Sequence, residues 1–136
     1  MEKDQIIYGT PPSKSNCYKI ININGHKSLG KTDRLRKYEQ DFYLQCTKYR
    51  DANIGQFKIY LDVYFPSNRN DLDNAMKVIL DCLQRVKAIQ NDNKCVSIYA
   101  EKYIDKGNPR IEFTIVPVDA DKQISPESHP ESLIPS

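Results

Sequence analysis

The stretch FKIYLDVYF at residues 57–65 decides the fold. Hydrophobic side chains occupy every second position, and the positions between them carry Lys58, Tyr60, Asp62 and Tyr64. A period of two is typical of a β-strand that buries one face and turns the other outward. The polar segment PSNRN at residues 66–70 then predicts the loop by which the chain leaves this strand.

A helix is expected directly after that loop, over about residues 73–87. Its buried stripe recurs at three- and four-residue spacing: Met76, Ile79, Leu80, Leu83 and Val86. Asp73, Lys77 and Asp81 recur every four residues on a different, polar stripe. The pattern therefore predicts a half-buried strand followed by a helix with one charged face.

The flanking sequence supplies the remaining elements. A helix capped by Thr32 or Asp33 is expected to run to about residue 49. Strands are expected at residues 5–8, 17–23, 26–29, 95–103 and 110–118, with Asn24-Gly25 closing a hairpin. These elements predict a single α+β domain, in which a mixed sheet of about four or five strands is covered on one face by two helices.

Length and composition limit the classes of protein. The chain has 136 residues, enough for one domain, and no stretch is long and apolar enough to span a bilayer. Its charged N-terminus lacks the apolar run of a signal peptide, so we expect a cytoplasmic protein. The four cysteines are widely spaced without a C-x-x-C pair, which indicates buried free thiols rather than zinc ligands or disulfides.

Charge is distributed unevenly along the chain. Residues 119–136 hold four acidic residues against Lys122, a net charge of −3, so the +2 total leaves +5 for the remainder. A mildly basic body is suited to a polyanionic partner without requiring one. The tail is rich in proline, serine and glutamate, and we expect it to be flexible.

The chemistry-bearing residues cluster where the second helix begins. Asp71, Asp73, Asn74 and Lys77 fall within seven residues, and Asp92 follows in a polar turn after the helix. Carboxylates are the ligands that hard divalent cations prefer, and a lysine beside them can stabilise charge on a phosphate. The cluster therefore makes the chain a nuclease candidate.

Each of these residues also has a structural interpretation. Asp73 could cap the helix, Asp71 could be a solvated loop residue, and Asp92 could serve only to form its turn. Lys77, one turn after Asp73, could make an ordinary helix ion pair. If strand 95–103 pairs beside strand 57–65, Asp92 lies near the end of the helix and not near its start. A bent path or a second subunit would then be needed to unite the carboxylates.

Three segments together resemble the RusA family of Holliday junction resolvases. They are RNDLDNAMK at residues 69–77, NDNK at 91–94 and GTPPSK at 9–14. The first contains the D-L-D-N-x-x-K signature of that family, and the resemblance covers roughly residues 6–118. It implies an endonuclease domain over residues 1–118, with the acidic tail at 119–136 outside it.

The resemblance implies a magnesium-dependent endonuclease, with Mn²⁺ able to substitute, that cuts four-way DNA junctions by paired symmetric nicks in recombination and repair. The catalytic carboxylates carry over onto Asp71, Asp73 and Asp92, which would bind the metal, and the essential lysine onto Lys77. Asn74, Asp81 and Asn91 would support them. The family acts as a homodimer, whose two-fold symmetry suits a two-fold symmetric substrate. Outward-facing Tyr60, Tyr64, Tyr99 and Tyr103 would suit such an interface.

Two departures from the family pattern leave alternatives open. Asn91 stands where the family has the first acid of a pair, and Arg69 is the single basic residue of the loop at 66–70. The chain could therefore be a non-catalytic junction-binding or assembly protein, or a nuclease for other branched DNA or RNA. Basic residues predicted to contact DNA phosphates are Lys14, Lys27, Lys31, Arg34 and Arg69.

Overall fold

The computed structural model describes residues 2–119. The expected flexible tail therefore lies, apart from Asp119, outside the described residues. The helices and strands follow in the order β1 (Gln5–Tyr8), η1 (Lys14–Asn16), β2 (Tyr18–Ile23), β3 (His26–Lys31), α1 (Asp33–Gln45), β4 (Phe57–Phe65), α2 (Leu72–Arg85), η2 (Asp92–Lys94), β5 (Cys95–Ile104) and β6 (Arg110–Pro117).

The main sheet is mixed, with strand order β1-β6-β4-β5. β4 pairs in parallel with β5 and antiparallel with β6, and β6 pairs antiparallel with β1. The alternation expected of residues 57–65 is confirmed, because the inward side chains of β4 are fully buried and the outward ones are not. The predicted α+β class is likewise confirmed.

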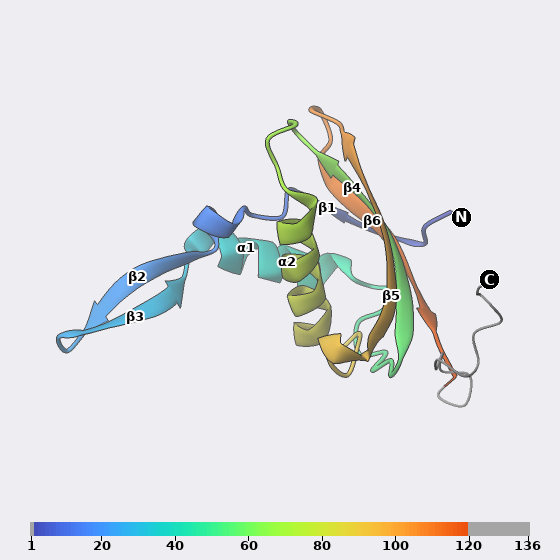
Figure 1. The fold of residues 1–136 in the computed structure, drawn as a ribbon, viewed down its shortest axis with the longest axis horizontal. Coiled ribbons are helices and arrows are strands. Elements are labelled where there is room, and N and C mark those ends of the chain that lie inside the picture. Colours follow the sequence, from blue (N-terminus) through green and yellow to red (C-terminus); the bar gives the residue numbers. More distant parts are fainter. Residues whose placement is uncertain (1, 120–136) are drawn as a thin grey trace, which may run out of the picture.

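Both helices lie on one face of this sheet, and the opposite face is left uncovered by them (Figure 1). On that open face the outward tyrosines of β4 stack on those of β5. Tyr60 lies 4.8 Å from Tyr99 and Tyr64 lies 5.0 Å from Tyr103, between ring centroids.

Among the described residues, neither α1 nor α2 combines the length and apolarity needed to cross a bilayer.

The helix boundaries differ from the sequence expectation by a few residues. α1 begins after Thr32, whose hydroxyl accepts the Leu35 N–H, but it ends at Gln45 because Cys46 leaves helical geometry with ψ near 61°. α2 begins at Leu72, one residue earlier than expected. Its buried stripe is also rotated slightly from the expected one, since Ala75, Val78 and Cys82 are buried while Met76 and Leu80 stay half-buried.

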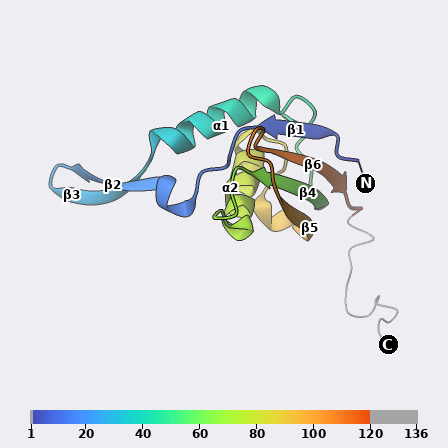
Figure 2. The ribbon, with the colours of Figure 1, turned by 90° about the horizontal axis from the view of Figure 1, so that it is seen from above.

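The predicted hairpin at Asn24-Gly25 is confirmed, and it forms a separate two-stranded sheet of β2 and β3. Both turn residues have positive φ, 52° and 81°, which this residue pair tolerates. The hairpin extends away from the body beyond the helices, as two views at right angles show (Figures 1 and 2).

The predicted burial of the cysteine thiols is confirmed for three of the four, all within the described residues. Cys17, Cys46 and Cys82 are buried, while Cys95 is half-buried at the start of β5. Burial raises the pKa of the Cys46 thiol to about 11, so this group stays protonated and behaves as a small apolar residue.

Gln5 is a buried polar residue that joins the first strand to the end of α1. Its amide nitrogen donates to the Gln45 carbonyl at 2.9 Å, and its amide oxygen accepts the Lys48 N–H at 2.8 Å. We predict that Gln5→Leu lowers the free energy of unfolding by about 1–3 kcal/mol, because both backbone groups lose their partner. Urea denaturation measures this change. The exposed control Gln40→Leu should leave the value nearly unchanged, and equal effects would contradict the assignment.

Candidate active site

The predicted catalytic residues line one groove along the exposed side of α2. The groove has a volume of about 880 Å³, and its walls also include Lys14, Cys17, Tyr18, Leu35 and Glu39. From the second helix and the turn after it come Asp71, Asp73, Asn74, Lys77, Asp81 and Asp92. The periodic polar stripe of α2 therefore forms the charged floor of a single groove, as its four-residue spacing requires.

Asp71 and Asp73 lie at the N-terminus of α2. Asp71 occupies the capping position, yet its side chain makes no capping hydrogen bond, and Asp73 falls within the first turn. Among the described residues neither carboxylate has a hydrogen bond or an ion pair. The partial positive charge of a helix N-terminus favours both as anions. The oxygens of these two carboxylates are therefore not occupied in capping the helix.

Asp92 approaches the groove from the opposite end of α2. Its backbone N–H donates to Gln84 Oε1 at 3.1 Å, which fixes it beside the last turns of the helix. Asn91 shapes this turn, because its side-chain oxygen accepts the Asn93 N–H at 3.0 Å. The parallel pairing of β4 with β5 thus places Asp92 where the sequence analysis anticipated, separated from Asp71 by the length of a helix that rises roughly 20 Å.

The donor chemistry of these residues fits a divalent cation, since carboxylate oxygens with no other partner are what such ions bind. The arrangement within one chain is incomplete, however. Across residues 2–119, no three histidine, cysteine or acidic side chains come close enough together to hold one metal ion. One chain therefore supplies candidate ligands without assembling a closed metal site.

Lys77 and Asp81 continue the polar stripe between the two ends. Burial raises the pKa of the Asp81 carboxyl, and the negative charge of Asp92 raises it further, while the positive charge of Lys77 opposes the shift. The pKa of Asp81 thus responds to Asp92 at one end of the groove and to Lys77 beside it on the stripe. Lys77 has no ion-pair partner in the described chain, which leaves its ammonium free to face an added anion.

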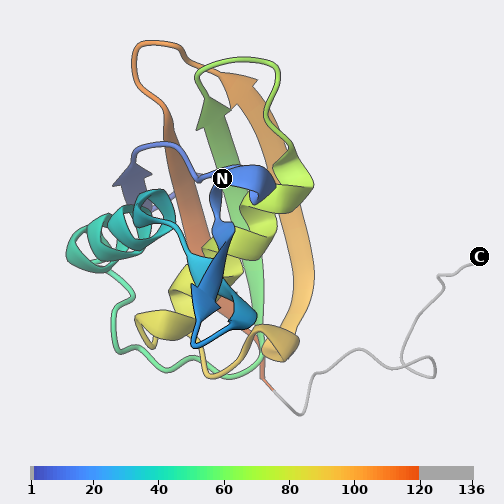
Figure 3. The ribbon, with the colours of Figure 1, turned by 90° about the vertical axis from the view of Figure 1, so that its left-hand side faces the viewer.

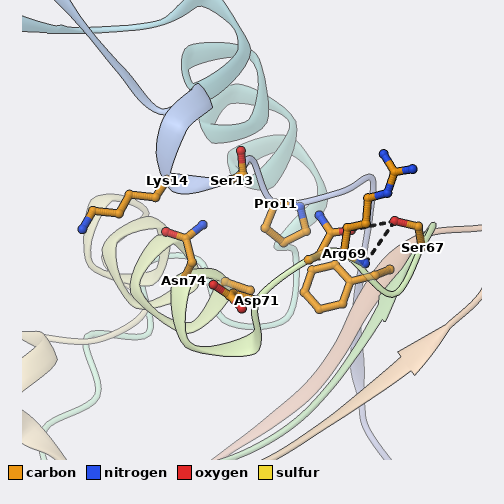
Figure 4. A pocket seen from close by; sticks show the side chains of 10 residues that line it. Pro11, Ser13, Lys14, Ser67, Arg69, Asp71 and Asn74 are labelled. Atoms are coloured by element: carbon orange, nitrogen blue, oxygen red, sulfur yellow. Dashed lines mark hydrogen bonds between the residues drawn. The ribbon is translucent and has the colours of Figure 1, made fainter.

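Asn74 connects the motif RNDLDNAMK, in which it lies, to the segment GTPPSK near the start of the chain. Its Nδ2 donates to the Pro12 carbonyl at 3.0 Å, which fastens the segment GTPPSK onto the first turns of α2. A smaller groove of about 380 Å³ adjoins this contact. In it Lys14 and Arg69 lie on opposite sides of Asp71 and Asn74 (Figure 4). The structure therefore brings two of the predicted phosphate-binding residues to the candidate carboxylates.

The other predicted DNA contacts lie elsewhere. Lys27 is exposed on β3 and Arg34 on the first turn of α1, and neither lines these two grooves. Lys31 is paired with Glu39 at 2.9 Å, between Nζ and Oε2, and Arg85 approaches the same carboxylate at 3.7 Å. Glu39 borders the larger groove, but sequence reasoning missed it because its partner Lys31 precedes the helix and follows no helical spacing.

Lys102 is a second residue that sequence reasoning missed. From β5 its ammonium donates to the carbonyl of Asn70 at 2.6 Å and to that of Asn68 at 3.2 Å, and it lies over the Phe65 ring. These bonds hold the loop immediately before Asp71. Lys102 pairs with the buried Val63 and so lies on the helix-facing side of the sheet, a position that depends on the register between β4 and β5.

Comparison with known proteins identifies the family. The family model described as endodeoxyribonuclease RusA matches residues 10–116. The chain therefore belongs to the RusA endodeoxyribonuclease family. It is also 27% identical over 110 residues to a crossover junction endodeoxyribonuclease RusA of Aquifex aeolicus (strain VF5), an alignment that covers 79% of this chain and 85% of that relative.

We predict that Lys102→Met increases the backbone mobility of residues 67–71, because two charge-assisted hydrogen bonds to carbonyls and the ammonium contact with the Phe65 ring are lost while a side chain of similar length is kept. Hydrogen–deuterium exchange of this loop, compared with that of α1, measures the effect. Lys106→Met, at the exposed β5–β6 turn, is the matched control. Unchanged exchange at residues 67–71 in Lys102→Met would show that the lysine does not hold the loop.

We predict that Asp81→Asn stabilises the protein at pH 7 in metal-free buffer. A raised pKa means that the folded state binds the proton more tightly than the unfolded state, so the ionised carboxylate is unfavourable to folding at neutral pH. The gain should shrink as the pH falls through the raised pKa and vanish below the ordinary value of 3.8. Unfolding free energies measured from pH 3 to pH 7 test this. A gain that grows toward acid would have the wrong sign.

Proposed function

We propose that this chain is a metal-dependent endodeoxyribonuclease that resolves four-way DNA junctions by paired symmetric nicks, in recombination and repair in the cytoplasm. One observation carries the proposal. In a chain of this family, Asp71, Asp73, Lys77 and Asp92 line a single groove with side chains free of other partners. The printed name of the Aquifex relative, crossover junction endodeoxyribonuclease, supports the same substrate.

In this proposal Asp71 and Asp73 of one chain hold Mg²⁺, for which Mn²⁺ can substitute, and an Asp92 carboxylate supplied by a second copy completes the site. The bound ion would lower the pKa of a water molecule and neutralise charge on the scissile phosphate. Lys77 would face a non-bridging phosphate oxygen, one helical turn from Asp73 on the same stripe. Lys14 and Arg69 flank the carboxylates and would orient the flanking phosphates, since both line the smaller groove beside Asp71.

The homodimer belongs to the same proposal. A second copy is a source of further ligands for the metal, because one chain does not gather three carboxylates within its described residues. The uncovered sheet face, with its two stacked tyrosine pairs, offers an apolar surface for that copy. A two-fold dimer would also present two sites to a junction that is itself two-fold symmetric.

A non-catalytic junction-binding protein is the second candidate. The same incomplete gathering of carboxylates in one chain favours it, as does Asn91 in place of an acid, since that side chain is occupied in shaping the turn. Cleavage separates the two candidates directly, because a binding protein holds the junction intact with Mg²⁺ or Mn²⁺ present.

We predict that Asp71→Asn and Asp73→Asn each reduce junction cleavage by at least 100-fold while the Kd for the junction changes less than threefold. The reason is that the carboxylates would bind the metal, whereas phosphate affinity comes from basic residues. A labelled synthetic four-way junction, beside a linear duplex of the same sequence, is incubated with each protein and Mg²⁺.

The control variant is Asp33→Asn, an exposed aspartate at the start of α1 outside both grooves. It should cut like the unmodified protein. Full cleavage by Asp71→Asn or Asp73→Asn would contradict the assignment of the site. Tight junction binding without any cleavage by the unmodified protein would support the binding-protein candidate.

A further inference from the structure

The β2–β3 hairpin, residues 18–31, projects from the body as an arm, and its root lies beside the candidate active site. Seen end-on, it stands in front of the helices (Figure 3). Lys14, at the start of η1, lines both grooves, and Tyr18, the first residue of the arm, lines the larger one. A ligand held in the larger groove would therefore continue onto the arm.

The arm exposes large apolar side chains that no part of the described chain covers. Ile20 and Leu29 are opposite each other in the antiparallel register and are 71% and 70% exposed. Tyr18 and Lys27 lie on the same face by the period of two. Exposed apolar residues of this size, paired on a projecting ribbon, indicate a surface that is covered by a partner.

The charge of this region indicates what the partner is. From Gln5 to Thr32 the chain contains no aspartate or glutamate, while it contains four lysines: Lys14, Lys19, Lys27 and Lys31. Lys31 is paired with Glu39, and the other three have no acidic partner among the described residues. A symmetric contact between two such arms would bring like charges together, whereas a polyanion would neutralise them.

We propose that the arm is a DNA-binding wedge, in which Lys19 and Lys27 contact phosphates and Ile20 and Leu29 press against bases at the branch point. The major groove is wide enough for a two-stranded β-ribbon, and apolar side chains are known to open base steps against which they pack. Base pairs at the centre of a four-way junction lack the continuous stacking of a duplex, so they are easier to separate there. This inference rests on the proposed function and adds the residues that would distinguish a junction from a linear duplex.

The test uses the full chain in metal-free buffer, so that binding is measured without cleavage. The probe is a four-way junction carrying 2-aminopurine at the branch point, beside a linear duplex with the same label. Ile20→Ser with Leu29→Ser should weaken junction binding at least tenfold, leave duplex binding within twofold and abolish the rise in 2-aminopurine fluorescence. The matched control is Tyr43→Ser with Leu44→Ser, two exposed apolar residues of α1.

The role of the arm's lysines is tested separately, by the salt dependence of DNA binding. Lys19→Gln with Lys27→Gln should reduce the slope of log Kd against log salt concentration by about two, since each lost phosphate contact removes about 0.9 from the slope on duplex DNA. Lys106→Gln with Lys37→Gln, two exposed lysines outside the arm, should leave the slope unchanged. Circular dichroism confirms that every variant is folded.

The possible results distinguish a failure of the wedge proposal from a failure of the proposed function. If the unmodified protein binds the junction and the Ile20→Ser, Leu29→Ser variant binds it equally well, the wedge is wrong while the proposed function stands. If the unmodified protein neither binds nor cuts the junction, the proposed function itself fails. If the serine variant becomes monomeric where the unmodified protein is dimeric, the arm is an interface between copies, and the wedge is again overturned.

Discussion

The parallel pairing of β4 with β5 is the constraint on which the rest of the structure depends. Two neighbouring parallel strands cannot be joined by a tight turn, so the chain must return along the sheet, and α2 makes that crossing. The crossing sets Asp71 at the end of β4 and Asp92 at the start of β5. The same pairing brings Lys102 of β5 to the loop that follows β4. One hydrogen-bonded ladder thus positions both ends of the groove.

The larger groove is lined by both acidic and basic side chains. The positive end of the helix dipole lies at the two carboxylates at the N-terminus of α2, while farther along the helix the charge of Asp92 raises the pKa of the Asp81 carboxyl. Lys77 lies between these groups, and Glu39 is neutralised by Lys31 and Arg85. The ionised Asp81 carboxylate is therefore unfavourable to folding, and a perturbed carboxyl of this kind in a groove is typical of a site of chemistry.

Two apolar surfaces lie outside the core, and they differ in character. The sheet face opposite the helices is partly satisfied by its own contacts, since the tyrosines stack in pairs and Arg110 lies 3.8 Å above the Tyr64 ring. The apolar side chains of the arm are covered by no such stacked pairs among the described residues, and lysines stand beside them along the ribbon. A sheet face whose aromatic rings already stack on one another is suited to contact with another protein surface. A narrow basic ribbon suits the groove of a nucleic acid.

The sequence by itself determined the local elements and the residues of the candidate site. A period of two defined β4, three- and four-residue spacing defined α1 and α2, and Asn24-Gly25 defined the hairpin, because each depends on neighbours within a few residues. The D-L-D-N-x-x-K motif likewise indicated Asp71, Asp73 and Lys77. Only the tertiary structure decided that Lys102 holds the loop before Asp71, that Asn74 binds the Pro12 carbonyl, and that Glu39 pairs with Lys31 beside the groove. These contacts join separate elements, so they follow from how the strands and helices pack and not from any spacing along the chain.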